Sequence, residues 1–164
     1  ITYVKFGDKV YSPIICENEA DFIVSFEKIE AVRWASCLKE GGKIIVNNQE
    51  IDPMPVITGA AEYPQGLVDQ MLVSGLDVDA FDALALAEQA GSAKAVNLVL
   101  MGKLSKYFDI PQEEWMAAIE QSVPPKFLEM NKKYSLRWDL NLRMKMLEQS
   151  IIILKTIPLL EGQQ

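Results

Sequence analysis

The sequence predicts a three-layer α/β/α fold, with a Rossmann-like, largely parallel sheet, an N-terminal hairpin and a helix-rich C-terminal half. Two observations support this prediction. Before residue 50, short apolar runs typical of strands covered on both faces alternate with helical periodicity, and beyond residue 66 helical spacing dominates. The 164 residues, 49% of them hydrophobic and 24% charged, are enough to bury a core without a disulfide or a metal.

The first fifteen residues predict the hairpin. Residues 1–6 alternate loosely between polar and apolar, Gly7-Asp8-Lys9 follows as a turn, and residues 10–15 form a second extended segment. Pro13 cannot donate a ladder hydrogen bond, so we expect this second strand at an edge of the sheet.

A strand–helix–strand unit follows the hairpin. Residues 21–26 are almost continuously apolar, helical spacing begins at Lys28, and residues 43–47 are a second buried strand. Gly41-Gly42 is expected to end the helix at its C-cap. Such units are right-handed in nearly all proteins.

The remaining segments are mostly helical. Residues 48–63 indicate an extended connection with a short strand at Val56-Ile57. Helices are expected at residues 66–73 and, after a short strand at 78–81, up to residue 90. Two more helices are expected, one from the N-cap Ser92 to residue 108 and one from Pro111 onward. Residues 126–155 contain neither glycine nor proline and predict a long terminal helix, or two with a bend near Ser135.

Composition excludes several chemistries within these residues. The sequence has no histidine, so it offers no Ser–His triad and no histidine metal ligand. Cys16 and Cys37 are too few for a Cys-only zinc site or a complete iron–sulfur cluster, and we expect two buried thiols in a reducing compartment. A net charge of −7 argues against nucleic acid as a partner. Without a long apolar run or a signal-peptide start, we expect a cytoplasmic protein with no membrane partner.

Position in the predicted sheet gives the best indication of a ligand site. Ligands of open α/β sheets bind outside the carboxyl ends of parallel strands, where Glu27 and Asn47 fall. Each of these residues either contacts a ligand or caps the loop that it begins. Asn97 lies in the first turns of an apolar helix, where it either contacts a phosphate-bearing ligand or caps a loop. No residue is assigned a catalytic or metal-binding role.

Several motifs, in the right order, resemble the gamma domain of the pyruvate/2-oxoacid:ferredoxin oxidoreductase family, and match its indolepyruvate type best. They are Tyr11-Ser12-Pro13, ADFIVSFEKIEAVR and LKEGGKIIVN at residues 20–47, AVNLVLMGKLSK around Asn97, and VPPKFLEMN at residues 123–131. We therefore expect a gamma-type domain over residues 1–134 and a C-terminal helical extension over residues 135–164.

The resemblance implies a subunit, not catalytic alone, of an enzyme that oxidatively decarboxylates an arylpyruvate to an acyl-CoA and passes electrons to ferredoxin. Thiamine diphosphate and iron–sulfur clusters are then expected in a larger alpha subunit, with CoA at a shared site. Asn97 matches the family's helix asparagine, which implies a CoA contact. The alternatives are a subunit acting on pyruvate or another 2-oxoacid, a non-catalytic α/β module that binds CoA or a nucleotide, and an interaction protein that docks through its terminal helix.

The family's domain normally opens with a glycine-rich strand–turn–helix of the GxGGQG kind. These residues contain no such segment, so we expect the N-terminal part of the domain to be missing from this sequence. No residue is therefore assigned to a nucleotide-cradling loop.

Overall fold

The computed structural model describes residues 1–89, 92–122 and 151–156. The chain divides into two compact units. Unit 1 comprises residues 1–81 and 149–164 and contains the sheet, whereas unit 2 comprises residues 82–148 and contains helices. Among the described residues, no helix is long and apolar enough to cross a bilayer.

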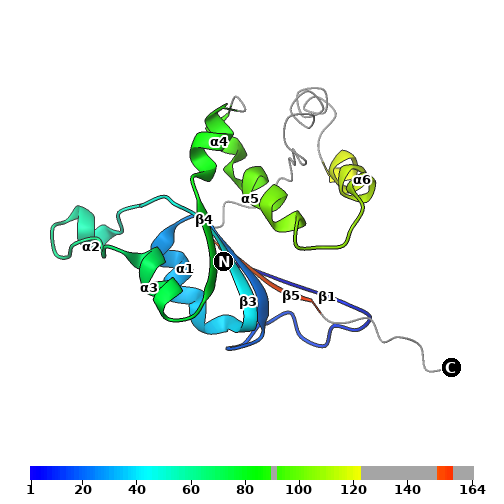
Figure 1. The fold of residues 1–164 in the computed structure, drawn as a ribbon, viewed down its shortest axis with the longest axis horizontal. Coiled ribbons are helices and arrows are strands. Elements are labelled where there is room, and N and C mark those ends of the chain that lie inside the picture. Colours follow the sequence, from blue (N-terminus) through cyan, green and yellow to red (C-terminus); the bar gives the residue numbers. More distant parts are fainter. Residues whose placement is uncertain (90–91, 123–150, 157–164) are drawn as a thin grey trace. The chain divides into compact units, whose positions relative to one another are not determined.

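Unit 1 is built on a five-stranded sheet with the order β1-β5-β2-β3-β4 (Figure 1). The strands are β1 (Thr2–Phe6), β2 (Ala20–Ser25), β3 (Leu38–Asn47), β4 (Asp77–Phe81) and β5 (Ile151–Thr156). Strands β2, β3 and β4 run parallel, β5 is antiparallel to β2, and β1 is parallel to β5. The predicted α/β class with a Rossmann-like, largely parallel sheet is therefore confirmed.

The core of unit 1 lies between this sheet and two helices. Helices α1 (Lys28–Trp34) and α3 (Leu67–Val73) contact each other on the same side of the sheet (Figure 1). Buried residues of one apolar cluster come from β2, β3 and both helices: Ile23, Ile44, Val46, Ala31 and Met71. Burial of these side chains removes apolar surface from water and so stabilises the unit.

Helix α1 is shorter than predicted. It ends at Trp34 and continues into the 3₁₀ helix η1 (Ala35–Cys37), and β3 then begins at Leu38. Gly41-Gly42 consequently lies inside β3 and not at a helix end. The register between β2 and β3 shifts beside these glycines, so the pair accommodates a bulge.

The predicted N-terminal hairpin is wrong. Strand β1 pairs with β5, and residues 7–18 contain no strand. Pro13 has no N–H for a ladder, and the Ser12 hydroxyl accepts a hydrogen bond from the Ile14 N–H at 3.2 Å. This local contact bends the segment where a second strand was expected.

The predicted terminal helix over residues 126–155 is wrong at its end, because Ile151–Thr156 forms β5. Three consecutive isoleucines open this strand, and β-branched residues favour strands over helices. Residues 123–150, which contain the rest of the predicted helix, lie outside the described residues.

The predicted short strand at Val56-Ile57 is also wrong, because these residues belong to helix α2 (Met54–Ile57). Pro55 lies in the first helical turn, where a missing N–H costs no intrahelical hydrogen bond. The Thr58 hydroxyl closes the turn by donating to the Met54 carbonyl at 3.0 Å. A single helical turn therefore replaces the expected strand.

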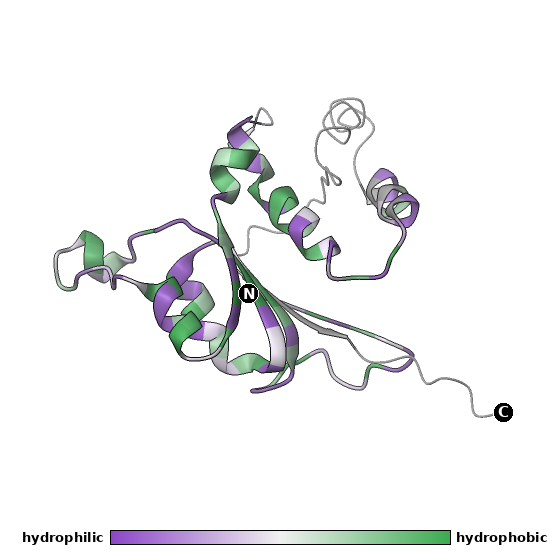
Figure 2. Cartoon of the chain, viewed as in Figure 1, coloured by the Kyte–Doolittle hydropathy of each residue, from purple (hydrophilic) through white to green (hydrophobic). Residues whose placement is uncertain are grey.

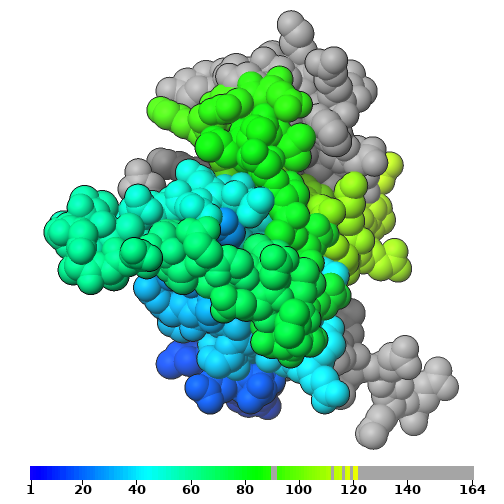
Figure 3. Space-filling model, turned by 60° about the vertical axis from the view of Figure 1, so that its left-hand side comes forward, coloured from blue at the N-terminus to red at the C-terminus, as the bar shows by residue number. Residues whose placement is uncertain are grey.

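Helix α2 belongs to a projecting segment of unit 1. We call residues 51–62 the α2 arm. None of its residues is buried, and it stands out on the left of the space-filling view (Figure 3). In Figure 2, α2 is coloured as hydrophobic although it lies away from the core.

Unit 2 contains α4 (Ala83–Gln89), the 3₁₀ helix η2 (Ala93–Ala95), α5 (Val96–Ser105) and α6 (Gln112–Ser122). As predicted, Ser92 is an N-cap, although of η2, and its hydroxyl accepts a hydrogen bond from the Lys94 N–H at 3.3 Å. Helix α4 packs against η2 and α5, and both α4 and α5 are mostly hydrophobic in Figure 2. The described part of the C-terminal half is thus helix-rich apart from β5.

Candidate functional site at the carboxyl edge of the sheet

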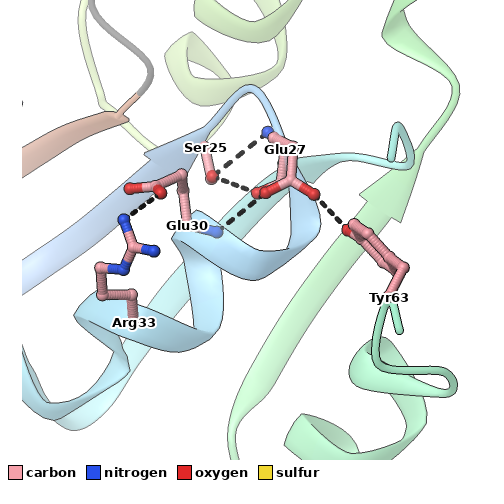
Figure 4. A network of polar contacts seen from close by, with 5 residues as sticks. All are labelled: Ser25, Glu27, Glu30, Arg33 and Tyr63. Carbon is pink, nitrogen blue, oxygen red and sulfur yellow. Dashed lines mark hydrogen bonds and ion pairs between the residues drawn. The ribbon is translucent and has the colours of Figure 1, made fainter. Parts of the chain in front are cut away.

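Glu27 directly follows β2, at the position that the sequence predicts. Only 4% of the residue is exposed. Its carboxylate caps α1 by accepting the Glu30 N–H at 3.0 Å, while its backbone carbonyl accepts the Ser25 hydroxyl at 2.6 Å (Figure 4). Glu27 therefore fixes the turn between β2 and α1 with both its side chain and its backbone.

Tyr63, which directly follows the α2 arm, completes this network. Its hydroxyl donates a hydrogen bond to Glu27 Oε1 (Figure 4), across 36 positions of sequence. Burial and this hydrogen bond raise the pKa of Tyr63 well above its usual value. Sequence analysis missed Tyr63, because a single tyrosine in a proline-containing connection carries no signal for a distant partner.

Asn47 ends β3, again where the sequence predicts it, and it is fully buried. Its amide Nδ2 donates to the Phe26 carbonyl at 3.2 Å and to Gln49 Oε1 at 3.0 Å. Since Phe26 immediately precedes Glu27, Asn47 joins the end of β3 to the turn that Glu27 caps. The structure thus brings Glu27 and Asn47 together at one edge of the sheet.

The cation next to this edge is already paired. Lys28 Nζ lies 2.5 Å from Glu50 Oε1 and 6.0 Å from the centre of the Tyr63 ring. The sequence adds no positive charge nearby in the chain, because residues 44–93 contain eight carboxylates and neither lysine nor arginine. The carboxyl edge therefore has a hydrogen-bonded frame, and Lys28, the cation beside it, is paired with Glu50.

The contacts of Glu27 and Asn47 fit the alternative in which each residue caps the loop that it begins. Asn97 is the second residue of α5 and is half-buried. It belongs to unit 2, whereas Glu27 and Asn47 belong to unit 1. A ligand contact of any of the three stays a prediction.

The described residues offer no metal site, since none of their His, Cys, Asp and Glu side chains gather in groups of three or more. Of the two thiols that were expected to be buried, Cys37 is buried but Cys16 is exposed, so that expectation is wrong for Cys16. Burial and the nearby Glu17 carboxylate raise the pKa of the Cys37 thiol. The polar side chains of the candidate site are therefore carboxylates, amides and a phenol.

Comparison with known proteins places this fold in a family. The profile of the family described as pyruvate ferredoxin/flavodoxin oxidoreductase matches residues 1–136. The chain is 40% identical to indolepyruvate oxidoreductase subunit IorB of Thermococcus kodakarensis over 140 residues, which are 81% of this chain and 68% of that relative. The subunit IorB of Pyrococcus horikoshii is 39% identical over the same shares, and that of Archaeoglobus fulgidus is 33% identical over 80% of this chain and 67% of the relative.

Proposed function

Because the chain belongs to the pyruvate ferredoxin/flavodoxin oxidoreductase family, we propose that it is the smaller, non-thiamine subunit of an indolepyruvate:ferredoxin oxidoreductase. The observation that carries the proposal is the 40% identity, over 81% of the chain, to a protein named as a subunit of indolepyruvate oxidoreductase. In the proposed reaction the arylpyruvate loses its carboxylate as CO₂. The remaining acyl group forms a thioester with the CoA sulfur, and the electron pair passes to ferredoxin.

The proposal assigns the reactive cofactors to a larger alpha subunit. Iron–sulfur clusters are typically held by four cysteine thiolates, and the sequence contains two cysteines. Thiamine diphosphate and the clusters, when bound by the larger subunit, supply decarboxylation and electron transfer. The chain described here contributes to CoA binding and to assembly.

Each unit is proposed to contribute its own residues to CoA binding: Glu27 and Asn47 in unit 1, and Asn97 in unit 2. Glu27 and Asn47 hold the ends of β2 and β3 in place through the contacts given above, and ligands of open sheets bind outside such ends. The Asn97 amide contacts CoA from the first turn of α5, where the helix dipole favours an anion.

The charge of unit 1 favours completion of CoA binding by the larger subunit. The CoA phosphates are anionic, whereas the segment from residue 44 to 93 carries eight carboxylates and no cation. Lys28, at the edge, is neutralised by Glu50. We therefore expect basic groups of the partner to balance part of the phosphate charge, and we expect the isolated chain to bind CoA weakly.

The test is reconstitution of the two subunits. Ferredoxin reduction with indolepyruvate and CoA is expected from the mixture, and from neither subunit alone. In the complex, Asn97→Ala is expected to raise the KM for CoA about tenfold, the loss expected for a hydrogen bond to a charged group, and to leave the KM for indolepyruvate unchanged. Gln121→Ala, at an exposed amide in α6 of the same unit, is the matched control. Turnover by the chain alone contradicts the proposal.

The family description favours a second candidate, in which the complex oxidises pyruvate or another 2-oxoacid. The same assay with a panel of 2-oxoacids decides between the two. A non-catalytic module that binds CoA or a nucleotide by itself is recognised by calorimetry, because the isolated chain then binds CoA as tightly as the complex does.

A further inference from the structure

The α2 arm is fixed at both of its ends. Where it leaves β3, Gln49 accepts a hydrogen bond from Asn47, and Glu50 forms an ion pair with Lys28. Where it returns, buried Tyr63 donates its hydroxyl hydrogen bond to Glu27. The arm is therefore held at the carboxyl edge of the sheet and is not a loose loop.

The conformation of the arm itself is also defined. The N–H groups of Ala60 and Ala61 both donate to the Pro55 carbonyl, at 2.8 and 3.0 Å, and Thr58 closes the turn of α2. Despite this order, the arm has no buried residue. Local hydrogen bonds therefore fix the conformation of the arm, whereas its side chains are not packed in a core.

That shape presents large apolar side chains to solvent. Met54 is 68% exposed and Ile57 is 65% exposed, and Ile51 is exposed at the start of the arm. Clustered apolar groups on an ordered projection are typical of a protein–protein contact, since leaving them in water costs free energy.

Charge indicates what kind of surface covers the arm. Asp52 and Glu62, within the arm, are exposed, and no lysine or arginine occurs between residues 44 and 93. A second copy of the chain, docked through the same patch, would bring these carboxylates together, and like charges across an interface are unfavourable. The fitting surface is an apolar groove with a basic rim.

We propose that the α2 arm inserts Met54 and Ile57 into an apolar groove of the larger subunit, whose rim carries lysine and arginine. This inference rests on the proposed function, which supplies that subunit as the occupant.

The experiment measures assembly of the full-length chain with the larger subunit, which is identified by its thiamine diphosphate and iron–sulfur content. The double variant Met54→Asp/Ile57→Asp is expected to weaken the complex more than tenfold, because it places carboxylates in an apolar groove. Val73→Asp is the matched control, because Val73 is 88% exposed at the far end of α3, outside the arm. It is expected to leave the affinity unchanged.

Two further measurements keep the test decisive if the double variant folds poorly. Asp52→Lys/Glu62→Lys changes only exposed side chains, and it is expected to weaken the complex and to reduce its sensitivity to salt. Amide hydrogen exchange of residues 51–62 is expected to be slower in the complex than in the isolated chain.

The outcomes separate the two proposals. If the wild-type chain forms no complex with such a subunit, the proposed function fails. If the wild-type complex forms and the arm variants bind equally well, or Val73→Asp is as harmful as the arm substitutions, the docking proposal alone fails. A dimer of the isolated chain that the arm substitutions dissolve would show that a second copy occupies the patch, and it also overturns the docking proposal.

Discussion

Glu27 contacts three different parts of the chain: helix α1, the end of β2 and the connection that leads to Tyr63. The carboxylate caps α1 through the Glu30 N–H and accepts the Tyr63 hydroxyl, while the backbone carbonyl accepts the Ser25 hydroxyl. A buried carboxylate is tolerated when such hydrogen bonds replace those to water. Removal of one partner leaves the carboxylate undersatisfied, which makes this network testable by single substitutions.

Tyr63→Phe is expected to lower the free energy of unfolding by about 1.5–3 kcal/mol, the usual range for a hydrogen bond to a charged group. Tyr11→Phe removes an exposed hydroxyl and is the control, with an expected change within about 0.5 kcal/mol. Urea denaturation of the full chain measures both. Equal effects of the two substitutions would show that the Tyr63 hydroxyl contributes nothing to stability.

The raised pKa of Tyr63 makes stability depend on alkaline pH. Above about pH 10 an unfolded tyrosine releases its proton, whereas the folded chain retains the proton on Tyr63. The unfolded state then binds fewer protons, so the free energy of unfolding falls as pH rises, by up to about 1.4 kcal/mol per pH unit. Below about pH 9 this contribution is constant.

Urea denaturation between pH 8 and pH 11 compares the wild type with Tyr63→Phe. The stability difference between them is expected to stay constant up to about pH 9 and to shrink above it. A difference that does not change over this range contradicts the account of Tyr63.

The candidate residues of the site were predictable only in part. Glu27 and Asn47 follow apolar runs, so their places at strand ends could be predicted from the local sequence. Tyr63 could not, because its partner is 36 positions away and the path of the connection is fixed only in the folded chain. Side-chain roles that depend on tertiary contact leave no local pattern.

At the scale of elements, Gly42 shows why β2 and β3 pair as they do. A Cβ at this position would lie 2.8 Å from Leu38 Cδ1 and 3.0 Å from the Ala20 carbonyl oxygen. Neither distance is compatible with a normal contact, and the backbone oxygen cannot move aside easily. The bulge in β3 therefore requires a glycine there.

Gly42→Ala is expected to lower the free energy of unfolding by about 1–3 kcal/mol, the cost of overpacking. Gly41 has a φ of +72° with open space around it, so Gly41→Asn, which tolerates this conformation, is expected to cost about 0.5 kcal/mol or less. Thermal unfolding of the full chain measures both. If Gly42→Ala is as mild as Gly41→Asn, close packing does not fix this position.

The same contrast between local and distant information explains which elements could be predicted. Strands β2 and β3 contain apolar runs, β4 coincides with the short strand expected at residues 78–81, and the existence of all three was predicted correctly. The partner of β1 is β5, about 150 positions away, and a turn next to β1 therefore suggested a hairpin that does not form. In the α2 arm, two prolines and a threonine build a helical turn from hydrogen bonds that the hydropathy pattern does not encode.

Across the whole molecule, charge is distributed unevenly along the chain. Residues 44–93 carry eight carboxylates without a cation, and the exposed apolar groups of the α2 arm lie within that stretch. Both features fit a chain that is completed by a basic, larger companion. They agree with the proposed docking of the chain on a larger subunit.

The central claim is that this chain functions as one subunit of a larger oxidoreductase. Native mass spectrometry of the protein, purified gently from its own cells, tests it most directly. The account predicts an assembly in fixed stoichiometry with a larger chain that contains thiamine diphosphate and iron–sulfur clusters. Recovery of the chain alone, or only with copies of itself, would contradict it.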